Sequence, residues 1–309
     1  MTQPTRNATS GRVYLDLRAL GRQTGRPTQE LLVVYVLERF LYRLATSTHR
    51  TRLILKGGML LATLDCRRPT ADIDLLARSV KGDRDRIAEI VRDIVGIAVD
   101  DGVVYDTERL TVRTIRDDQL YAGVRLTLPA QVDRARAVLR LDVNVGDPVT
   151  PGPVEVEYPG LLSGSFRLLG YPLATVLAEK VVTMIERGAA ITRERDFADV
   201  VLLSHRHPVD ADVLLSALRA TSAYRESRLH PLAGLFGELG RDRQSSWTAY
   251  VARSGLAESL PRDYGEAIAE VIAFVDPVLT GAALSASWEP TKRIWLDATW
   301  NGDGERRRR

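Results

Sequence analysis

The segment "RLILKGGMLLATLDCRRPTADIDLL" at residues 52–76 decides the fold of this chain. It begins with an apolar stretch that predicts a short buried strand from Arg52 to Leu55, and a second strand is predicted at Ile73–Leu76. Asp72 and Asp74 should share one face of that second strand, because successive side chains of a strand alternate between faces. The segment therefore combines a glycine break with two carboxylates, which fits a structural turn or half of an active site.

The glycine break consists of Gly57 and Gly58, between the first predicted strand and a predicted helix over 59–65. Backbone N–H groups at such a strand-to-helix turn can bind an anion, and glycine lets the backbone approach a phosphate closely. Turns also use glycine pairs for purely structural reasons. Lys56, directly before the glycines, could reach a phosphate or could neutralise the nearby acids.

The carboxylates suggest a cation site. Two carboxylates ~6–7 Å apart along a strand repel each other unless a cation lies between them, and Mg²⁺ prefers oxygen ligands. Asp142 lies in a predicted strand over 137–147, where a carboxylate is costly unless it is paired or bound to a cation. Three carboxylates would suit a two-metal site for phosphoryl transfer. Solvated aspartates at a strand end, with Asp142 facing water, would explain the same pattern.

The rest of the chain predicts an α+β fold. Its 309 residues, 45% apolar and 27% charged, are ordinary for a globular protein with a sizeable core. Strands are expected in the first half and mainly helices in the second, so we predict a strand-rich core with N-terminal helices over 1–150, a helical domain over 151–305 and a basic tail over 306–309. Helices are predicted over residues 28–46, 83–97, 173–187, 194–205, 211–221, 246–256 and 264–279, and further strands at 103–106, 109–115 and 122–130.

Charge and composition exclude several classes of protein. The net charge of +3 includes the four terminal arginines, so the pI of 9.1 is weak evidence for a nucleic-acid partner. That tail could attract phosphates or could simply aid solubility. No apolar run of membrane-spanning length occurs, and the single cysteine, Cys66, excludes an internal disulfide and a cysteine-based zinc site. We expect a cytoplasmic protein with no membrane association.

Four ordered motifs together resemble one family. The stretches "LKGGMLL", "RRPTADIDLL", "AEKVVTM" and "RERDFADVVLL" are similar to the AbiEii family of nucleotidyltransferase-like toxins, which includes the mycobacterial MenT toxins. The resemblance covers residues 28–205 and none of the C-terminal third. It implies a DNA polymerase β-like nucleotidyltransferase core with a mixed sheet, followed by a mainly helical C-terminal domain.

The resemblance also implies site residues. Gly57 and Gly58 match the glycine turn that cradles nucleotide phosphates, and Asp72 and Asp74 match the metal-binding pair. Lys180 matches the lysine thought to contact the triphosphate. Asp196 and Asp199 match the two acids of the Arg-Asp-x-x-Asp segment. Arg68 and Thr70 match the Arg-x-Ser/Thr residues that precede the metal-binding aspartates. Asp199 matches the acid that activity requires. Without the resemblance, a snorkelling lysine and surface ion pairs would account for the helical residues.

Three positions depart from the family pattern or extend it. Met59 stands where many relatives have a hydroxyl that could bind a phosphate, so only its backbone amide is expected to contribute. Asp142 corresponds loosely to the third carboxylate of polymerase-type enzymes. Thr70 matches a hydroxyl that can be the target of inactivating modification, which makes it a candidate regulatory site.

These residues predict an enzyme that transfers a nucleoside monophosphate from an NTP to an acceptor with the help of two Mg²⁺ ions. The family implies the 3′ end of tRNA as the acceptor, a block of translation, and an AbiEi-type antitoxin whose direct binding stays open. Two other hypotheses remain: transfer to a protein hydroxyl or a small molecule, and a non-catalytic nucleotide-binding regulator. The preferred NTP and the oligomeric state do not follow from the sequence.

Overall fold

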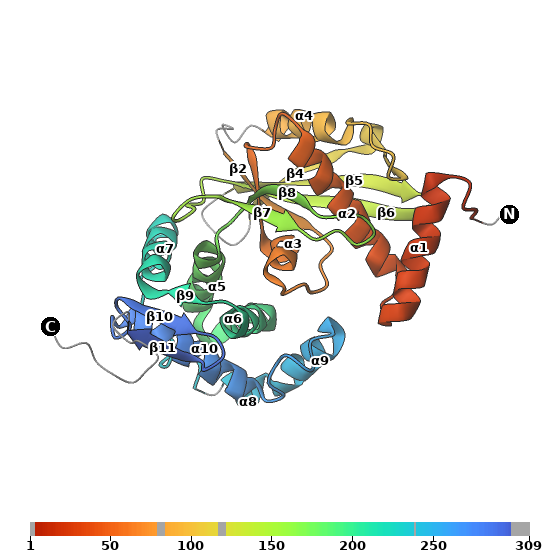
Figure 1. The fold of residues 1–309 in the computed structure, drawn as a ribbon. Helices are drawn as coiled ribbons and strands as arrows, with labels where there is room; N and C mark the ends of the chain where they lie inside the picture. Colours follow the sequence, from red (N-terminus) through yellow and green to blue (C-terminus); the bar gives the residue numbers. More distant parts are fainter. Residues whose placement is uncertain (1–3, 79–83, 117–121, 238, 298–309) are drawn as a thin grey trace. The chain divides into compact units, whose positions relative to one another are not determined.

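The computed structural model describes residues 4–78, 84–116, 122–237 and 239–297, and its elements are drawn in Figure 1. The chain forms two compact units. The first comprises Met1–Thr63, Pro69–Asp147 and Pro153–Tyr171, and the second comprises Leu64–Arg68, Pro148–Gly152 and Pro172–Arg309. The predicted basic tail over 306–309 lies outside the described residues.

The first unit is built on an eight-stranded mixed sheet. Its strand order is β3-β5-β6-β2-β1-β8-β7, and β4 also pairs with β5. The pairs β2–β6 and β1–β8 are parallel, and the others are antiparallel. The strands are β1 (Leu53–Lys56), β2 (Ile73–Ala77), β3 (Val103–Tyr105), β4 (Thr111–Arg116), β5 (Ala122–Val132), β6 (Ala135–Val145), β7 (Val154–Tyr158) and β8 (Phe166–Gly170).

Three long helices complete this unit: α1 (Thr9–Thr24), α2 (Thr28–Thr46) and α4 (Arg84–Val95). Helix α2 packs against β6 and β8, and its apolar side chains cover most of its circumference, as predicted. Two arginines nevertheless point into this interior. Arg39 and Arg43 donate to the buried Asp101 carboxylate, with shortest distances of 3.0 and 2.5 Å, so the buried charges are paired.

The second unit is mainly helical. Its helices are α5 (Leu173–Arg187), α6 (Glu194–Arg206), α7 (Ala211–Tyr224), α8 (Leu239–Asp242), α9 (Gln244–Ser254) and α10 (Tyr264–Leu279). A small sheet of order β11-β10-β9 joins them, formed by β9 (Val209–Asp210), β10 (Ala286–Glu289) and β11 (Ile294–Asp297). The predicted helices over 173–187 and 264–279 are confirmed to the residue.

Aromatic side chains fill the interior of the second unit. The Trp288 and Trp295 rings lie against Phe274 at centroid distances of 4.8 and 5.5 Å, and their indole N–H groups donate to backbone carbonyls of Ser204 and Phe274. Trp288 is buried and Trp295 is half-buried, and both pack within this unit. Within the described part of the chain, no helix is both long and apolar enough to cross a membrane.

Candidate active site

The glycine break lies at the end of β1, beside the first carboxylates. Strand β1 pairs antiparallel with β2 so that Lys56 lies opposite Asp74. Gly57 follows with a φ of 64°, in the left-handed region that glycine tolerates best. A Cβ atom at Gly57 would overlap the carboxylate of Asp74. Glycine is therefore required here by the backbone angle and by the close approach of an acidic side chain.

The helix after the glycines is shorter than predicted. Helix α3 spans Gly57–Leu60 and passes into a 3₁₀ turn over Leu61–Leu64, whereas the sequence predicted a helix over 59–65. One turn of helix has a small dipole, so the backbone amides, and not the helix as a whole, are what this turn can offer to an anion. The Met59 side chain is 1% exposed, and its sulfur accepts a hydrogen bond from the Tyr158 hydroxyl at 3.8 Å. Met59 thus packs in the core and leaves only its backbone available.

Asp72 and Asp74 flank the start of β2. Ile73 between them is fully buried, and both aspartates are half-buried, which confirms that the carboxylates lie on the opposite face from the core. The Thr70 hydroxyl donates to the Asp72 carboxylate at 3.0 Å. Thr70 therefore orients this carboxylate, a role that the sequence analysis did not assign to it.

Strand register places four charged residues in one row across the sheet. Lys56 lies opposite Asp74, Asp74 lies beside Asp142 in the parallel β2–β6 pair, and Asp142 lies opposite Arg125 in the β5–β6 hairpin. We call these four residues the charged row. Neighbouring strands lie ~4.8 Å apart, and residues in register share a face of the sheet. The sheet thus brings Asp74 and Asp142 together although they are far apart in the sequence.

Arg125 was not among the predicted site residues. Its guanidinium donates to both carboxylate oxygens of Asp142, at 2.7 and 2.6 Å, in a bidentate ion pair. Asp142 is 9% exposed, so its charge is compensated by this pair. Lys56 is the strand partner of Asp74. Its amine donates to Asp147 at 2.6 Å and lies 5.2 Å from the centre of the Tyr171 ring. Lys56 therefore pairs with the acid Asp147, and its contact with a phosphate stays a prediction.

The carboxylates suit a divalent cation in chemistry and in register. Asp72 and Asp74 offer acceptor oxygens at one strand start, with Asp142 on the adjoining strand. Among the described residues, however, no three His, Cys, Asp or Glu side chains are placed so that they could hold a metal ion together. Both oxygens of Asp142 accept hydrogen bonds from the Arg125 guanidinium. Asp72 and Asp74 are the carboxylates that would hold a cation, and Asp142 is already paired with Arg125.

The other predicted residues gather in the second unit around Asp199. This carboxylate is fully buried and accepts hydrogen bonds from Arg68, at 2.9 and 3.2 Å, and from the Lys180 amine at 2.5 Å. Burial alone would raise the pKa of the Asp199 carboxyl, but the charges of Lys180 and Arg68 and their hydrogen bonds hold the pKa below its usual value. Arg68, Lys180 and Asp199 form what we call the ion cluster.

Asp196 extends this cluster. It is 1% exposed, it lies 3.4 Å from the Lys180 amine, and its other oxygen lies 2.6 Å from Arg193. Asp196 and Asp199 thus both face Lys180 from a buried position, and surface ion pairing does not describe them. The Lys180 amine bonds to these two acids, and its side chain is 12% exposed.

Tyr250 is a neighbour of the ion cluster that the sequence analysis missed. It lies on α9, in the part of the chain without a recognised motif. Burial, followed by the charge of Asp199, raises the pKa of its hydroxyl to about 12. This buried hydroxyl has no hydrogen-bond partner among the described residues. No sequence pattern distinguishes Tyr250, so only the structure could reveal its position.

The mixed sheet places aspartates on adjoining strands beside a glycine turn, an arrangement that suits a nucleotidyltransferase. The sequence matches one family over residues 39–273, described as "Nucleotidyl transferase AbiEii toxin, Type IV TA system". Because this match spans well over half of the chain, the protein belongs to the AbiEii family. The predicted family and the predicted α+β fold class, a mixed sheet followed by a mainly helical region, are confirmed.

Two solved structures from Helicobacter pylori are similar to this chain, that of a candidate nucleotidyltransferase and that of JHP933. Each is 14% identical and has a TM-score of 0.47, and each alignment covers 82% of this chain and 96% or 93% of the other. No match was found among curated proteins. The family assignment rests on the sequence match alone.

Proposed function

We propose that this protein is a toxin that transfers a nucleoside monophosphate from an NTP to the 3′ end of an RNA acceptor, with tRNA as the favoured acceptor, and thereby blocks translation. Membership of the AbiEii family supports nucleotidyl transfer within a type IV toxin–antitoxin system. The observation that carries the proposal is the charged row, in which Asp74 and Asp142 share one face of the sheet beside Gly57.

In this proposal the acceptor hydroxyl gives its proton to water and its oxygen bonds to the α-phosphorus. The bond from the α-phosphorus to the oxygen that bridges it to the β-phosphate breaks, and pyrophosphate leaves. When bound at Asp72 and Asp74, Mg²⁺ would neutralise charge on the reacting phosphate. Thr70 orients Asp72 for this purpose. Gly57 and Gly58 carry no side chains that could shield the backbone amides of residues 57–59 from a phosphate. Arg125 keeps the charge of Asp142 compensated.

The ion cluster gives the second unit a role in the same proposal. Asp199 holds Lys180 and Arg68 as a fixed pair of cations in a buried setting, where charges act strongly on a polyphosphate. We infer that Lys180 contacts the β- and γ-phosphates and that Asp199 positions it. An AbiEi-type protein is the expected antitoxin partner, and a cytoplasmic location follows from a tRNA acceptor.

The test is to incubate the purified protein with each labelled NTP, Mg²⁺ and total RNA, and to separate RNA from protein afterwards. Label should appear in tRNA, should require Mg²⁺, and should vanish in Asp72→Asn. Asp100→Asn is the matched control, because Asp100 is an exposed aspartate of the same unit. Label only in protein would favour transfer to a protein hydroxyl, and label in neither, with NTP still bound, would favour a non-catalytic regulator.

A further inference from the structure

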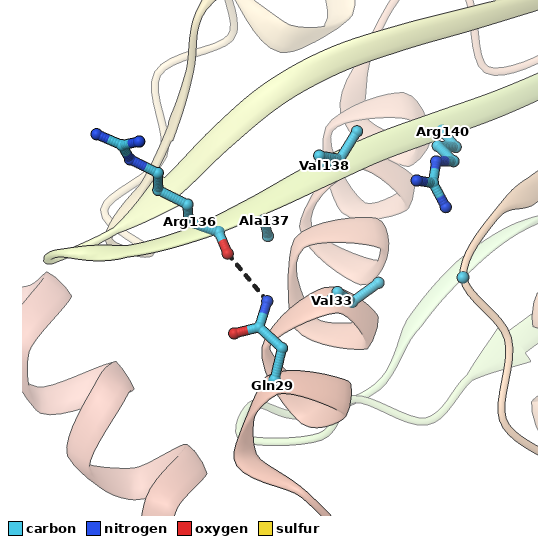
Figure 2. Close-up of a pocket in the computed structure, with 7 residues that line it drawn as sticks. Gln29, Val33, Arg136, Ala137, Val138 and Arg140 are labelled. Atoms are coloured by element: carbon cyan, nitrogen blue, oxygen red, sulfur yellow. Dashed lines mark hydrogen bonds between the residues drawn. The ribbon is translucent and has the colours of Figure 1, made fainter.

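A pocket of ≈ 260 Å³ opens beside β6 in the first unit (Figure 2). It is lined by residues 136–138 and Arg140 of β6, by Gln29 and Val33 of α2, and by Ala71. It exists because β2 pairs with β6 only from Leu141 onward, so the preceding part of β6 pairs with β5 alone among the described strands. Gln29 closes one end, where its side-chain amide donates to the Arg136 carbonyl at 3.0 Å.

The pocket adjoins the carboxylates from two directions. Ala71 in its wall is the residue directly before Asp72. Arg140 in its wall stands two residues before Asp142 on the same strand, so the two side chains share a face and their Cα atoms lie ~6.7 Å apart. A molecule that occupied the pocket would therefore end beside Asp72 and Asp142.

The lining combines small apolar surface with cationic groups. Val33, Val138 and Ala71 provide apolar wall, and none of the lining residues is acidic. Arg136 and Arg140 are exposed, and neither forms an ion pair within the described part of the chain. The volume lies just below the ~300–1,000 Å³ typical of small-molecule sites. These properties suit one flat base with its flanking phosphates, because guanidinium groups bind phosphates bidentately and also stack on bases.

We propose that this pocket, built on Arg136, Arg140 and Val138, holds a nucleoside of the single-stranded RNA acceptor adjacent to the 3′-terminal hydroxyl. The inference rests on the proposed function and adds to it the site at which the acceptor strand is held. Base and phosphates would enter along the free edge of β6, and the terminal hydroxyl would arrive at Asp72. Single-stranded RNA fits better than duplex, because a pocket of this size takes an unstacked base.

The test separates binding from transfer. A fluorescent single-stranded RNA that ends in a 3′-deoxynucleotide is titrated without NTP, over a range of salt concentrations, against wild type, Arg136→Ala/Arg140→Ala and Val138→Glu. Arg92→Ala/Arg167→Ala is the control, because it removes the same charge from two exposed arginines of the same unit. Transfer kinetics with extendable RNA then give KM values for RNA and for NTP, and circular dichroism verifies the fold of each variant.

We expect the Arg136/Arg140 variant to bind RNA at least ~10-fold more weakly and to lower the salt slope by ~1.4, because each phosphate contact to a single strand contributes ~0.7. Val138→Glu should weaken binding as well, the control should match wild type, and KM for NTP should stay unchanged in all of them. Unchanged RNA affinity in both pocket variants overturns the inference, as does a raised KM for NTP alone, which would assign the pocket to the incoming nucleotide. If wild type binds the RNA through these arginines yet transfers nothing to it, the proposed function fails and the pocket inference stands.

Discussion

The ion cluster predicts a large loss of stability when Asp199 is replaced by Asn. The Asp199 carboxylate is fully buried, and it is the closest charge partner of Arg68 and Lys180, whose side chains are 11% and 12% exposed. Asparagine keeps the shape but removes the charge, so two largely buried cations lose their nearest counter-ion. Removing one partner of a buried ion pair costs ~3–5 kcal/mol. We expect about 3 kcal/mol, because Lys180 keeps Asp196 at 3.4 Å.

Tryptophan fluorescence is the suitable assay. The chain has four tryptophans, and all of them follow residue 246, so they belong to the unit that holds Asp199. With a urea dependence of ~1–3 kcal/mol per molar, a loss of about 3 kcal/mol lowers the unfolding midpoint by about 1 M or more. Asp100→Asn, an exposed substitution in the first unit, should leave the same transition within ~0.5 kcal/mol of wild type.

The pH dependence offers a second readout. The pKa of Asp199 is lowered in the folded protein, so its contribution is fully present above the unfolded-state pKa of ~3.9 and is lost as the pH falls through the lower folded-state value. The gap between wild type and Asp199→Asn should therefore stay constant from about pH 5 to 8 and shrink below about pH 4. A variant that unfolds at the wild-type midpoint at pH 7 would refute this account of the cluster.

Three further perturbations test the two units separately. Gly57→Ala should cost ~1–2 kcal/mol of stability in thermal unfolding, because Gly57 has a left-handed backbone, and it should abolish transfer by displacing Asp74. The control is Gly25→Ala, where φ is 70° and no atom lies close to the added Cβ. It should show the same backbone strain and keep activity. Arg125→Gln frees the Asp142 carboxylate, so Mn²⁺ should bind up to about fivefold more tightly in calorimetric titration. Asp142→Asn should not gain affinity for Mn²⁺. Unchanged Mn²⁺ affinity in Arg125→Gln would contradict competition between the guanidinium and the ion. Tyr250→Phe should leave the free energy of unfolding unchanged or raise it by ~1 kcal/mol, because the buried hydroxyl has no hydrogen-bond partner among the described residues. Tyr35→Phe should lower the free energy of unfolding by ~1 kcal/mol, because it removes the hydrogen bond to the Asp101 carbonyl. A loss of stability for Tyr250→Phe in calorimetric unfolding would reveal a partner for its hydroxyl.

Periodicity predicted the elements that bury one continuous apolar face. Helices α5 and α10 and strand β2 carry such faces, and their predicted bounds agree with the structure to within a residue. Strands β7 and β8 were not predicted. Strand β7 reads "VEVEY" and is largely exposed at the sheet edge, so its alternating apolar and charged residues do not correspond to a buried and an exposed face. The short α3 differs from its predicted form because Gly57 itself opens the helical turn.

The motif residues were predicted, but their partners depended on packing. Asp196 and Asp199 at helical spacing fit a solvated face as well as a buried one, and only the position of α6 against α5 and of Arg68 decides that they are buried. Thr70 stands close enough to Asp72 in the sequence that its hydrogen bond follows from local geometry. Tyr250 has neither a motif nor a local partner, so its place beside the ion cluster needed the folded chain.

The charged row shows which part of a site register alone can supply. Strands β5 and β6 are joined by the two residues Asp133 and Arg134, and a two-residue hairpin fixes every cross-strand pair. Once that turn is recognised, Arg125 must lie opposite Asp142, so this partner was within reach of the sequence. The placement of Asp74 beside Asp142 was not, because the parallel pairing of β2 with β6 joins strands that no short turn connects. The motif alone presents the aspartates as free carboxylates, whereas the cross-strand register places Arg125 opposite Asp142, where the two form an ion pair.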